Sequence, residues 1–400
     1  MQTRPLSGYR VLDLSNVLAG PFCCHQLAHL GSDVIKIERP GSGDLARQLG
    51  AEESLNKQLM GVSYLAQNSG KRSITLDLKS DGGKAVFHKL LSTADVLVEN
   101  YRPGVMTRLG LAYPDLKADY PELIYCAISG FGQHGPIAEA PAYDQIVQGM
   151  SGVMSITGSC ESAPNRVGYP IADTIGGMTA AFAIAAALAH PSPGRGAFID
   201  VSMLDSMLAT MGWVVSNYLV AGKIPQAMGN DNFTASPSGT FRTGDGLINI
   251  AANRQVQFES LCHIVARPEL ISDERFKDRQ QRLNNRAALT ALLEESLCAE
   301  TSAHWVDKFN RAGVPAGPVL TVPDILDHPQ IRARDLVTQF DDVPGMNDPL
   351  KVVRTGLHIN GHSPSTESRP PQLGEQTDSI LSELGFTVEE INNLRNQRAI

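Results

Sequence analysis

The stretch RVLDLSNVLAGPFCCHQLAHLGSDVIKIE, residues 10–38, decides the fold of this 400-residue chain. Residues 10–14 and 33–38 are short runs rich in aliphatic and β-branched side chains, which is typical of buried strands. Residues 21–30, between them, have a helical pattern. Strand, helix and strand in this order predict a parallel sheet with a right-handed crossover.

The alternation of strands and helices continues along the chain and predicts an α/β fold. A second, smaller unit is expected to begin near residue 241, after a loop-rich stretch. The further predicted strands are residues 73–77, 95–99, 123–127 and 247–251, and the further predicted helices are residues 83–92, 174–189, 203–220, 255–265, 285–298, 302–312, 377–384 and 387–396.

Several common enzyme classes are not indicated by their motifs. The first predicted strand runs into SNVLAGPF instead of GxGxxG, which argues against a nicotinamide or flavin dehydrogenase. The sequence has no GxxxxGK[ST] either, which argues against a P-loop hydrolase. It lacks GxSxG and HExxH, so neither an α/β-hydrolase nor a zinc protease is indicated.

Composition indicates a globular protein without nucleic acid, metal or membrane partners. The net charge of −8 argues against a nucleic-acid partner. Six cysteines are scattered without metal-ligand spacing, which favours free thiols in a reducing, cytoplasmic compartment. The N-terminus lacks the apolar segment of a signal peptide, and the Ala-rich stretch 178–189 is short enough for a buried helix.

Asp173 is the most conspicuous candidate nucleophile. It follows an apolar run and precedes a nearly uncharged helical stretch, IADTIGGMTAAFAIAAAL. Aspartate is a preferred N-cap, so Asp173 could simply begin this helix. Alternatively, the helix dipole keeps the carboxylate ionised and nucleophilic. Gly176 and Gly177 weaken the first turn, which predicts that another group approaches the backbone closely there.

Five basic residues stand near the ends of predicted strands, where a parallel sheet presents its ligand-binding loops. Guanidinium and ammonium groups suit phosphate recognition, although any one of them could be solvated surface charge. Together they predict a polyanionic ligand. These residues are Arg39, Lys71, Arg72, Arg102 and Arg108.

Motifs run along essentially the whole chain in a fixed order. They are VLDLSNVLAGPF, LGSDVIKIERPGSGD, NSGKRSITLDLK, DVLVENYRPGVMTRLG, SGFGQHGP, APAYDQIVQGMSG, PIADTIGGMTAA, GRGAFIDVSMLDS, GVPAGPVLTV, DHPQIRARDLV and PPQLGEQTDSILSELG. This ordered set resembles the class III (CaiB/BaiF-type) CoA-transferase family, which includes formyl-CoA transferase, carnitine CoA-transferase and α-methylacyl-CoA racemase.

The resemblance implies a Rossmann-like large domain and a smaller α+β domain. The large domain would combine residues 1–224 with the returning C-terminal segment 326–400, and the small domain would comprise residues 225–325. Two copies would interlock into a ring-like, obligate homodimer. The substrates would be an acyl-CoA and a small carboxylic acid, and no metal would be needed.

The resemblance also implies the reacting groups. By motif position, Asp173 is the catalytic aspartate, and Val17, Leu18 and Ala19 lie in the loop that lines the active site. Asp173 would form an acyl–aspartyl anhydride and then an aspartyl-CoA thioester, which an acceptor carboxylate attacks. Arg39, Lys71 and Arg108 would hold the nucleotide and phosphates of CoA, with Arg72 and Arg102 as further candidates.

The stretch APAYDQ separates transferases from racemases in this family. Racemases carry a His–Asp pair there, whereas this chain has Tyr143 and Asp144. A phenol with an ordinary pKa of about 10 is a poor base near neutral pH, so we expect transfer and not racemisation. Asp144 either orients Asp173 or its loop, as an acidic residue does in formyl-CoA transferase, or caps the helix that starts at Gln145.

One segment departs from formyl-CoA transferase, which covers its active site with a run of glycines. Residues 229–239 read GNDNFTASPSG instead, which predicts a mobile loop and a different acyl selectivity. We expect a short dicarboxylate acceptor, with succinyl-CoA or acetyl-CoA as donor. The alternatives are an acyl-CoA racemase or isomerase of the same family and a non-catalytic CoA-binding subunit.

Overall fold

The computed structural model describes residues 4–189 and 196–400 and divides into two compact units. Unit 1 consists of Met1–Val153, Arg166–Lys223 and Pro329–Ile400, and unit 2 of Met154–Asn165 and Ile224–His328. Both strands and helices are present, which confirms the predicted mixed α/β class. The units differ from the predicted domain bounds chiefly because the short segment Met154–Asn165 belongs to unit 2.

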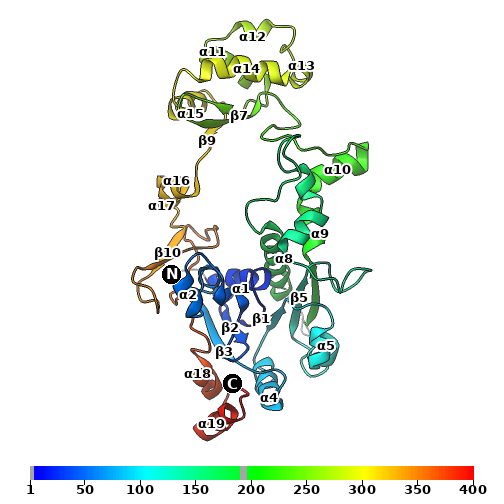
Figure 1. Ribbon diagram of the computed structural model, residues 1–400, viewed down its shortest axis with the longest axis vertical. Coiled ribbons are helices and arrows are strands. Elements are labelled where there is room, and N and C mark those ends of the chain that lie inside the picture. The colour runs from blue at the N-terminus through cyan, green and yellow to red at the C-terminus, as the bar shows by residue number, and fades with distance from the viewer. Residues whose placement is uncertain (1–3, 190–195) are drawn as a thin grey trace. The chain divides into compact units, whose positions relative to one another are not determined.

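A six-stranded parallel sheet forms the centre of unit 1 (Figure 1). Its strands are β1 (Arg10–Leu14), β2 (Asp33–Glu38), β3 (Lys71–Thr75), β4 (Val96–Glu99), β5 (Ile124–Ser129) and β6 (Ala197–Ser202). The strand order is β3-β2-β1-β4-β5-β6, with every neighbouring pair parallel. The order reverses between β1 and β4, which is where open α/β sheets form a ligand-binding crevice at their carboxyl edge.

Helices cover both faces of this sheet. On one face, Leu12, Ile35 and Leu97 form a core with apolar side chains of α4 and the C-terminal helices. On the other face, α1 packs against β1 and β2, and α8 packs against β5 and β6. Parallel strands need this burial on both faces, which explains their continuous apolar runs. The helices involved are α1 (Ala19–His29), α4 (Asp81–Leu91), α8 (Ile171–Leu188), α18 (Thr377–Glu383) and α19 (Val388–Asn396).

The glycines of α8 allow its close packing. A Cβ atom on Gly177 would collide with the carbonyl oxygen of Ala19 at the start of α1, and one on Gly176 would lie 2.9 Å from Met203 Cγ. The predicted close approach to this helix is therefore confirmed. Helix α1 and helix α8 consequently begin beside each other.

Some elements differ from the prediction. The strand β6 was not predicted, and exposed and part-buried residues alternate over its first four positions. The helix predicted at 203–220 is two helices, α9 (Met203–Thr210) and α10 (Gly212–Ala221), which separate at Met211 before a glycine. Helix α8 begins earlier than predicted, directly after Pro170.

Unit 2 is an α+β unit built on a three-stranded antiparallel sheet. Its strands are β7 (Ser238–Arg242), β8 (Leu247–Ala251) and β9 (Ala316–Pro318). Phe258, Leu289 and Trp305 belong to its buried core. The helices of this unit are α11 (Gln255–Ile264), α12 (Glu269–Ser272), α13 (Arg279–Asn284), α14 (Arg286–Leu297), α15 (Ser302–Arg311) and α16 (Val322–Asp327).

The C-terminal segment returns to unit 1. The hairpin β10 (Val337–Phe340) and β11 (Leu350–Val353) precedes it, and the N–H of Gln376 then donates to Ser73 O at 3.0 Å beside β3. The remaining elements are the 3₁₀ turns η1 (Leu45–Gln48) and η2 (Val153–Ile156) and the short helices α2 (Glu53–Lys57), α3 (Val62–Leu65), α5 (Val105–Leu109), α6 (Tyr113–Leu116), α7 (Asp144–Met150) and α17 (Pro329–Ala333).

Candidate active site

A pocket of about 230 Å³ lies at the carboxyl edge of the parallel sheet, where the strand order reverses. The loops after β1, β4 and β5 and the first turn of α8 contribute to its wall. The predicted site residues that line it are Val17, Leu18, Ala19, Arg102, Tyr143 and Asp173. Polar groups that were not predicted also line it, namely Asn16, Asn100 and Ser129.

The loop after β1 is held by side chains from elsewhere in the sheet. Asn100 accepts a hydrogen bond from the N–H of Asn16 at 2.7 Å and donates to Asn16 O at 2.8 Å. Val17 has a φ of 66°, a left-handed conformation that β-branched residues rarely adopt. Its N–H donates to Asp44 Oδ1 at 2.9 Å. Such a residue stores about 1–3 kcal/mol of strain and needs surroundings that hold it.

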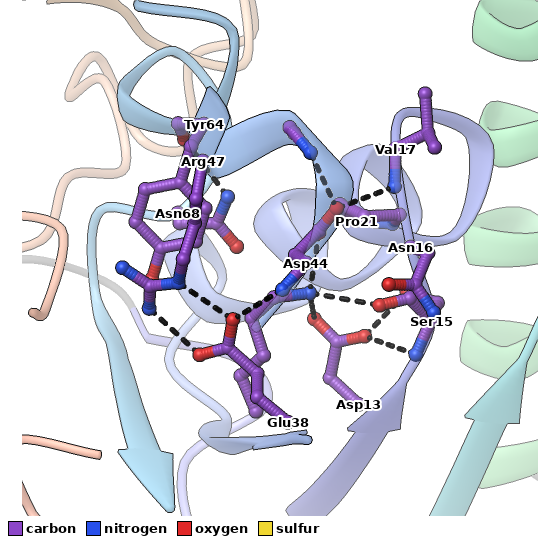
Figure 2. A network of polar contacts seen from close by, with 12 residues as sticks. Asp13, Ser15, Asn16, Val17, Pro21, Glu38, Asp44, Arg47, Tyr64 and Asn68 are labelled. Atoms are coloured by element: carbon purple, nitrogen blue, oxygen red, sulfur yellow. Dashed lines mark hydrogen bonds and ion pairs between the residues drawn. The ribbon is translucent and has the colours of Figure 1, made fainter. Parts of the chain in front are cut away.

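A cluster of fully buried charges adjoins this loop (Figure 2). Asp13 Oδ2 lies 2.8 Å from Lys71 Nζ and 3.9 Å from Lys36 Nζ. Burial alone would raise the pKa of Asp13, but the two lysines lower it to about 2. Lys71 also donates to Pro21 O at 2.9 Å. The ammonium group that was predicted to bind CoA is therefore engaged inside unit 1, where it neutralises a carboxylate.

Asp173 is the third residue of α8 and not its N-cap. The helix begins at Ile171 with Pro170 as N-cap, so the capping interpretation of Asp173 is wrong. The carboxylate lines the pocket and accepts no hydrogen bond from residues 4–189 or 196–400. Burial, and then the charge of Asp144, raise its pKa to about 7. This corrects the expectation that the helix start alone keeps it ionised, because both protonation states are populated near neutral pH.

Asp144 holds the backbone that carries Asp173. It is the first residue of α7, and its Oδ1 accepts hydrogen bonds from the N–H groups of Ala172 at 2.8 Å and Asp173 at 3.4 Å. Its Oδ2 accepts from Gln148 Nε2 at 2.7 Å. The side chain thus satisfies donors at the start of α8 and none at the start of α7. Of the two interpretations, the structure supports the one in which Asp144 orients Asp173.

The remaining predicted cations fall into two groups. Arg39 and Arg108 are exposed and lie outside the pocket lining, as surface cations that a phosphate could reach. Arg72, in contrast, lies 2.7 Å from Asp33 and 2.7 Å from Glu383. Arg102 is the predicted cation that the structure brings into the pocket with Asp173.

Several residues at the site were missed from the sequence. Asn16 and Asn100 closely follow β1 and β4, and a polar residue after each of two parallel strands is a signal that could have found them. Lys36 interrupts the apolar strand VIKIE, and a charge in a buried strand also indicates a specific partner.

In unit 2, the loop 229–239, whose composition predicts mobility, receives hydrogen bonds from neighbouring helices. Three arginines from α13 and α14 donate to backbone carbonyl groups of this loop, and a pocket of about 520 Å³ adjoins it. Arg279, Arg282 and Arg286 reach the carbonyls of Thr234, Ser236 and Ala235 at 2.8, 2.9 and 3.2 Å, respectively.

Two further features of the described residues concern metal ligands and membrane-spanning helices, and α8 is the element of interest for the latter. Within residues 4–189 and 196–400, no group of three or more His, Cys, Asp or Glu side chains is arranged to hold a metal ion. One helix there, α8, is long and apolar enough to span a bilayer, a property that core helices of soluble proteins share.

Comparisons with known proteins point to one family. The family model described as CoA-transferase family III matches residues 6–377. An acetyl-CoA:oxalate CoA-transferase from Acetobacter aceti is 40% identical over 95% of both chains. A succinate–glutarate CoA-transferase from Agrobacterium fabrum is 36% identical, covering 95% of this chain and 96% of the relative. A solved CaiB/BaiF family protein from Brucella suis superposes with a TM-score of 0.83 at 36% identity, covering 96% of this chain and 100% of that one.

Proposed function

The chain belongs to CoA-transferase family III and is a CoA-transferase, and we propose that it passes CoA to a short dicarboxylate through covalent intermediates on Asp173. The observation that carries the proposal is the position of the Asp173 carboxylate. It stands without a hydrogen-bond partner from the described chain in a pocket at the reversal of the sheet. A carboxylate left unpaired at such a position is available for attack on an acyl group.

The proposed reaction exchanges acyl groups in four displacements. The Asp173 carboxylate attacks the donor thioester and the C–S bond breaks. CoA thiolate departs, and an acyl–aspartyl anhydride is formed. The thiolate attacks the aspartyl carbonyl, which releases the donor acid and forms an aspartyl-CoA thioester. The acceptor carboxylate attacks that thioester and expels the thiolate again. The thiolate finally takes the new acyl group, which restores the Asp173 carboxylate without net proton transfer.

Each displacement develops negative charge on a carbonyl oxygen. Backbone N–H groups at the start of α1 are candidates to stabilise this charge. The N–H groups of Leu18 and Ala19 have no hydrogen-bond acceptor within residues 4–189 and 196–400, and both residues line the pocket. Unpaired N–H groups at a helix N-terminus are suited to an oxyanion. We propose that they fulfil this role.

The acceptor and donor are inferred from the relatives and from charge. The two curated relatives described above are named for oxalate or for succinate and glutarate. We propose a short dicarboxylate acceptor for this chain, with succinyl-CoA or acetyl-CoA as donor. Arg102 in the pocket could pair with the carboxylate that does not react, and Arg39 and Arg108 with CoA phosphates.

We further propose a Rossmann-like large domain and an interlocked homodimer in the cytoplasm. The dimer is supported by apolar side chains of unit 1 that this chain leaves uncovered. Phe182 is 75% exposed, Trp213 is 79% exposed and Val220 is 87% exposed. Apolar surface of this kind is typical of obligate interfaces. The cysteines of the described chain are all free, which agrees with a reducing compartment.

A panel assay and a trapping experiment test the proposal. Acetyl-CoA and succinyl-CoA would each be offered with C2–C6 mono- and dicarboxylic acids, and we expect turnover with a dicarboxylate. Hydroxylamine added during turnover should convert the activated Asp173 carbonyl to a hydroxamate, detected by mass in the Asp173 peptide. The protein incubated without acyl-CoA is the control. Turnover without a modification at Asp173 would contradict the proposed nucleophile.

A further inference from the structure

We propose that Lys36 and Asp44 are positioning residues for the reaction. Their buried ion pair would hold residues 15–17 in the conformation that presents the start of α1 to Asp173. The inference rests on the proposed function, because it assigns to both residues an effect on turnover at that site. Neither side chain lines the pocket, so both would act through the loop.

Lys36 connects the cluster of buried charges to the loop backbone. Its side chain is fully buried, and Nζ donates to Ser15 O at 2.9 Å. Nζ also lies 3.0 Å from Asp44 Oδ2 and 3.9 Å from Asp13 Oδ2. Burial alone would lower the pKa of Lys36, but the carboxylates around it raise that pKa above its usual value. The ammonium group is therefore charged, and it anchors the carbonyl of Ser15, two residues before the strained Val17.

Asp44 holds the next part of the loop. Its Oδ1 accepts from the N–H groups of Val17 and Ala46, each at 2.9 Å. Its Oδ2 faces Lys36 as an ion pair without hydrogen-bond geometry. Its own N–H donates to Glu38 Oε1 at 3.0 Å, and Glu38 is in turn paired with Arg47 (Figure 2). The backbone of Asp44 is thus held by Glu38, and its side chain faces Lys36.

The two residues act on consecutive parts of one short segment. Lys36 binds the carbonyl of Ser15, Asn100 binds both backbone groups of Asn16, and Asp44 binds the N–H of Val17. The left-handed conformation of Val17 then turns the chain directly into α1. A β-branched residue would leave this conformation if its N–H lost its acceptor.

The buried charges make this arrangement sensitive to single substitutions. Removing one member of a buried ion pair leaves its partner uncompensated and displaces it, whereas an exposed pair can rehydrate. Because Lys36 and Asp44 both hold the loop, either displacement moves the same backbone. A shift of about 1 Å at a reacting centre can lower turnover about 100-fold.

A double-mutant cycle with Asp44→Ala and Val17→Gly tests the inference. Glycine adopts a positive φ without strain, so Val17→Gly keeps the conformation but removes the strain that Asp44 is proposed to hold in place. We expect Asp44→Ala alone to lower kcat about 100-fold with little change in the KM for acyl-CoA. In the Val17→Gly background the same substitution should lower kcat less than about threefold. Equal losses in both backgrounds would overturn the inference.

Two further variants separate positioning from stability. Ser80→Ala removes the hydroxyl that caps α4 through Gly83 N–H at 3.0 Å and does not line the pocket, so it should lower thermal stability without changing kcat. Asp44→Asn keeps an acceptor for Val17 but removes the charge that faces Lys36. It should fold and lose about tenfold in kcat. A folded Asp44→Asn protein with normal kcat would also overturn the inference.

The assay uses succinyl-CoA with glutarate or acetyl-CoA with oxalate, whichever pair the unmodified protein turns over. If Asp173→Ala abolishes turnover but the Asp44 variants leave kcat unchanged, only this inference fails. If Asp173→Ala retains turnover, the proposed nucleophile fails, independently of the outcome at Asp44.

Discussion

Two aspartates in unit 1, the buried Asp13 and the half-buried Asp173, have opposite electrostatic surroundings. Asp13 lies against two lysines, and its pKa falls to about 2 although burial opposes this. Asp173 has no cation beside it, and burial, followed by the charge of Asp144, raises its pKa to about 7. The side chains are chemically identical. A carboxylate neutralised by lysines serves the structure, and one left without a cation is available for chemistry.

The largest expected effect is on turnover at the unpaired carboxylate. Asp173→Asn should lower kcat by at least about 10⁴-fold, because an amide cannot form the anhydride. Asp205 is the matched control, since it is likewise the third residue of a helix but is exposed. Asp205→Asn should retain turnover in the same coupled assay. If both variants retain it, the contrast between the carboxylates of Asp13 and Asp173 has no functional meaning.

The next largest effect is on stability at the paired carboxylate. Lys71→Met leaves Asp13 buried beside one lysine at 3.9 Å, and the free energy of unfolding should fall by about 3–5 kcal/mol. Arg72→Met, which breaks part-exposed ion pairs, should lower it by only about 0–1 kcal/mol. Urea denaturation measures both. If the Lys71→Met protein had normal stability but weakened CoA affinity, this would instead support the predicted role of Lys71 as a CoA ligand.

A smaller effect is expected where α8 packs against α1. The Cβ atom of Gly177→Ala would meet the backbone of Ala19, which should destabilise the protein by about 1–3 kcal/mol and lower kcat by displacing the first turn. Gly176→Ala is the control, because its Cβ would meet the flexible side chain of Met203. Thermal unfolding and kcat should therefore separate two adjacent glycines. Equal behaviour would show that the contact with Ala19 relaxes easily.

The smallest expected effect is a shift of the pH profile. The attacking form of Asp173 is deprotonated, so kcat/KM should rise with pH through about 7. Asp144→Asn removes a negative neighbour, lowers the pKa of Asp173 and should move this limb to lower pH by about one unit. The ratio of kcat/KM for the variant to kcat/KM for the unmodified protein should therefore be higher at pH 6 than at pH 8. A limb that moves upward would contradict the assignment of Asp144 as the cause.

Much of the fold was predictable because it depends on local periodicity. β1 and β2 have the predicted bounds, and each predicted helix except the one at 203–220 corresponds to a single helix of the structure. The prediction of one helix over residues 203–220 was wrong because Gly212, which disfavours a helix interior, interrupts the apolar pattern there. β6, a strand at the edge of the sheet, was also missed.

The candidate site was predictable only in part. The loop 17–19, Tyr143 and Asp173 lie together in one pocket, as the order of motifs implied. Lys71 and Arg72 were grouped with Arg39 and Arg108 because a sequence does not distinguish a solvated cation from a paired one. Asn100 and Asp44 were missed because their partners, Asn16 and Val17, lie 84 and 27 residues away in the chain.

The sequence by itself determined the alternation of strands and helices, the family and Asp173 as the candidate nucleophile. These follow from periodicity and from the order of motifs, which are properties of the linear chain. Only the tertiary structure decided that Asp173 stands without a cation while Asp13 is neutralised by Lys71, 58 residues away. The physical reason is that charge state depends on burial and on neighbours within a few ångströms, and folding brings these together from distant positions.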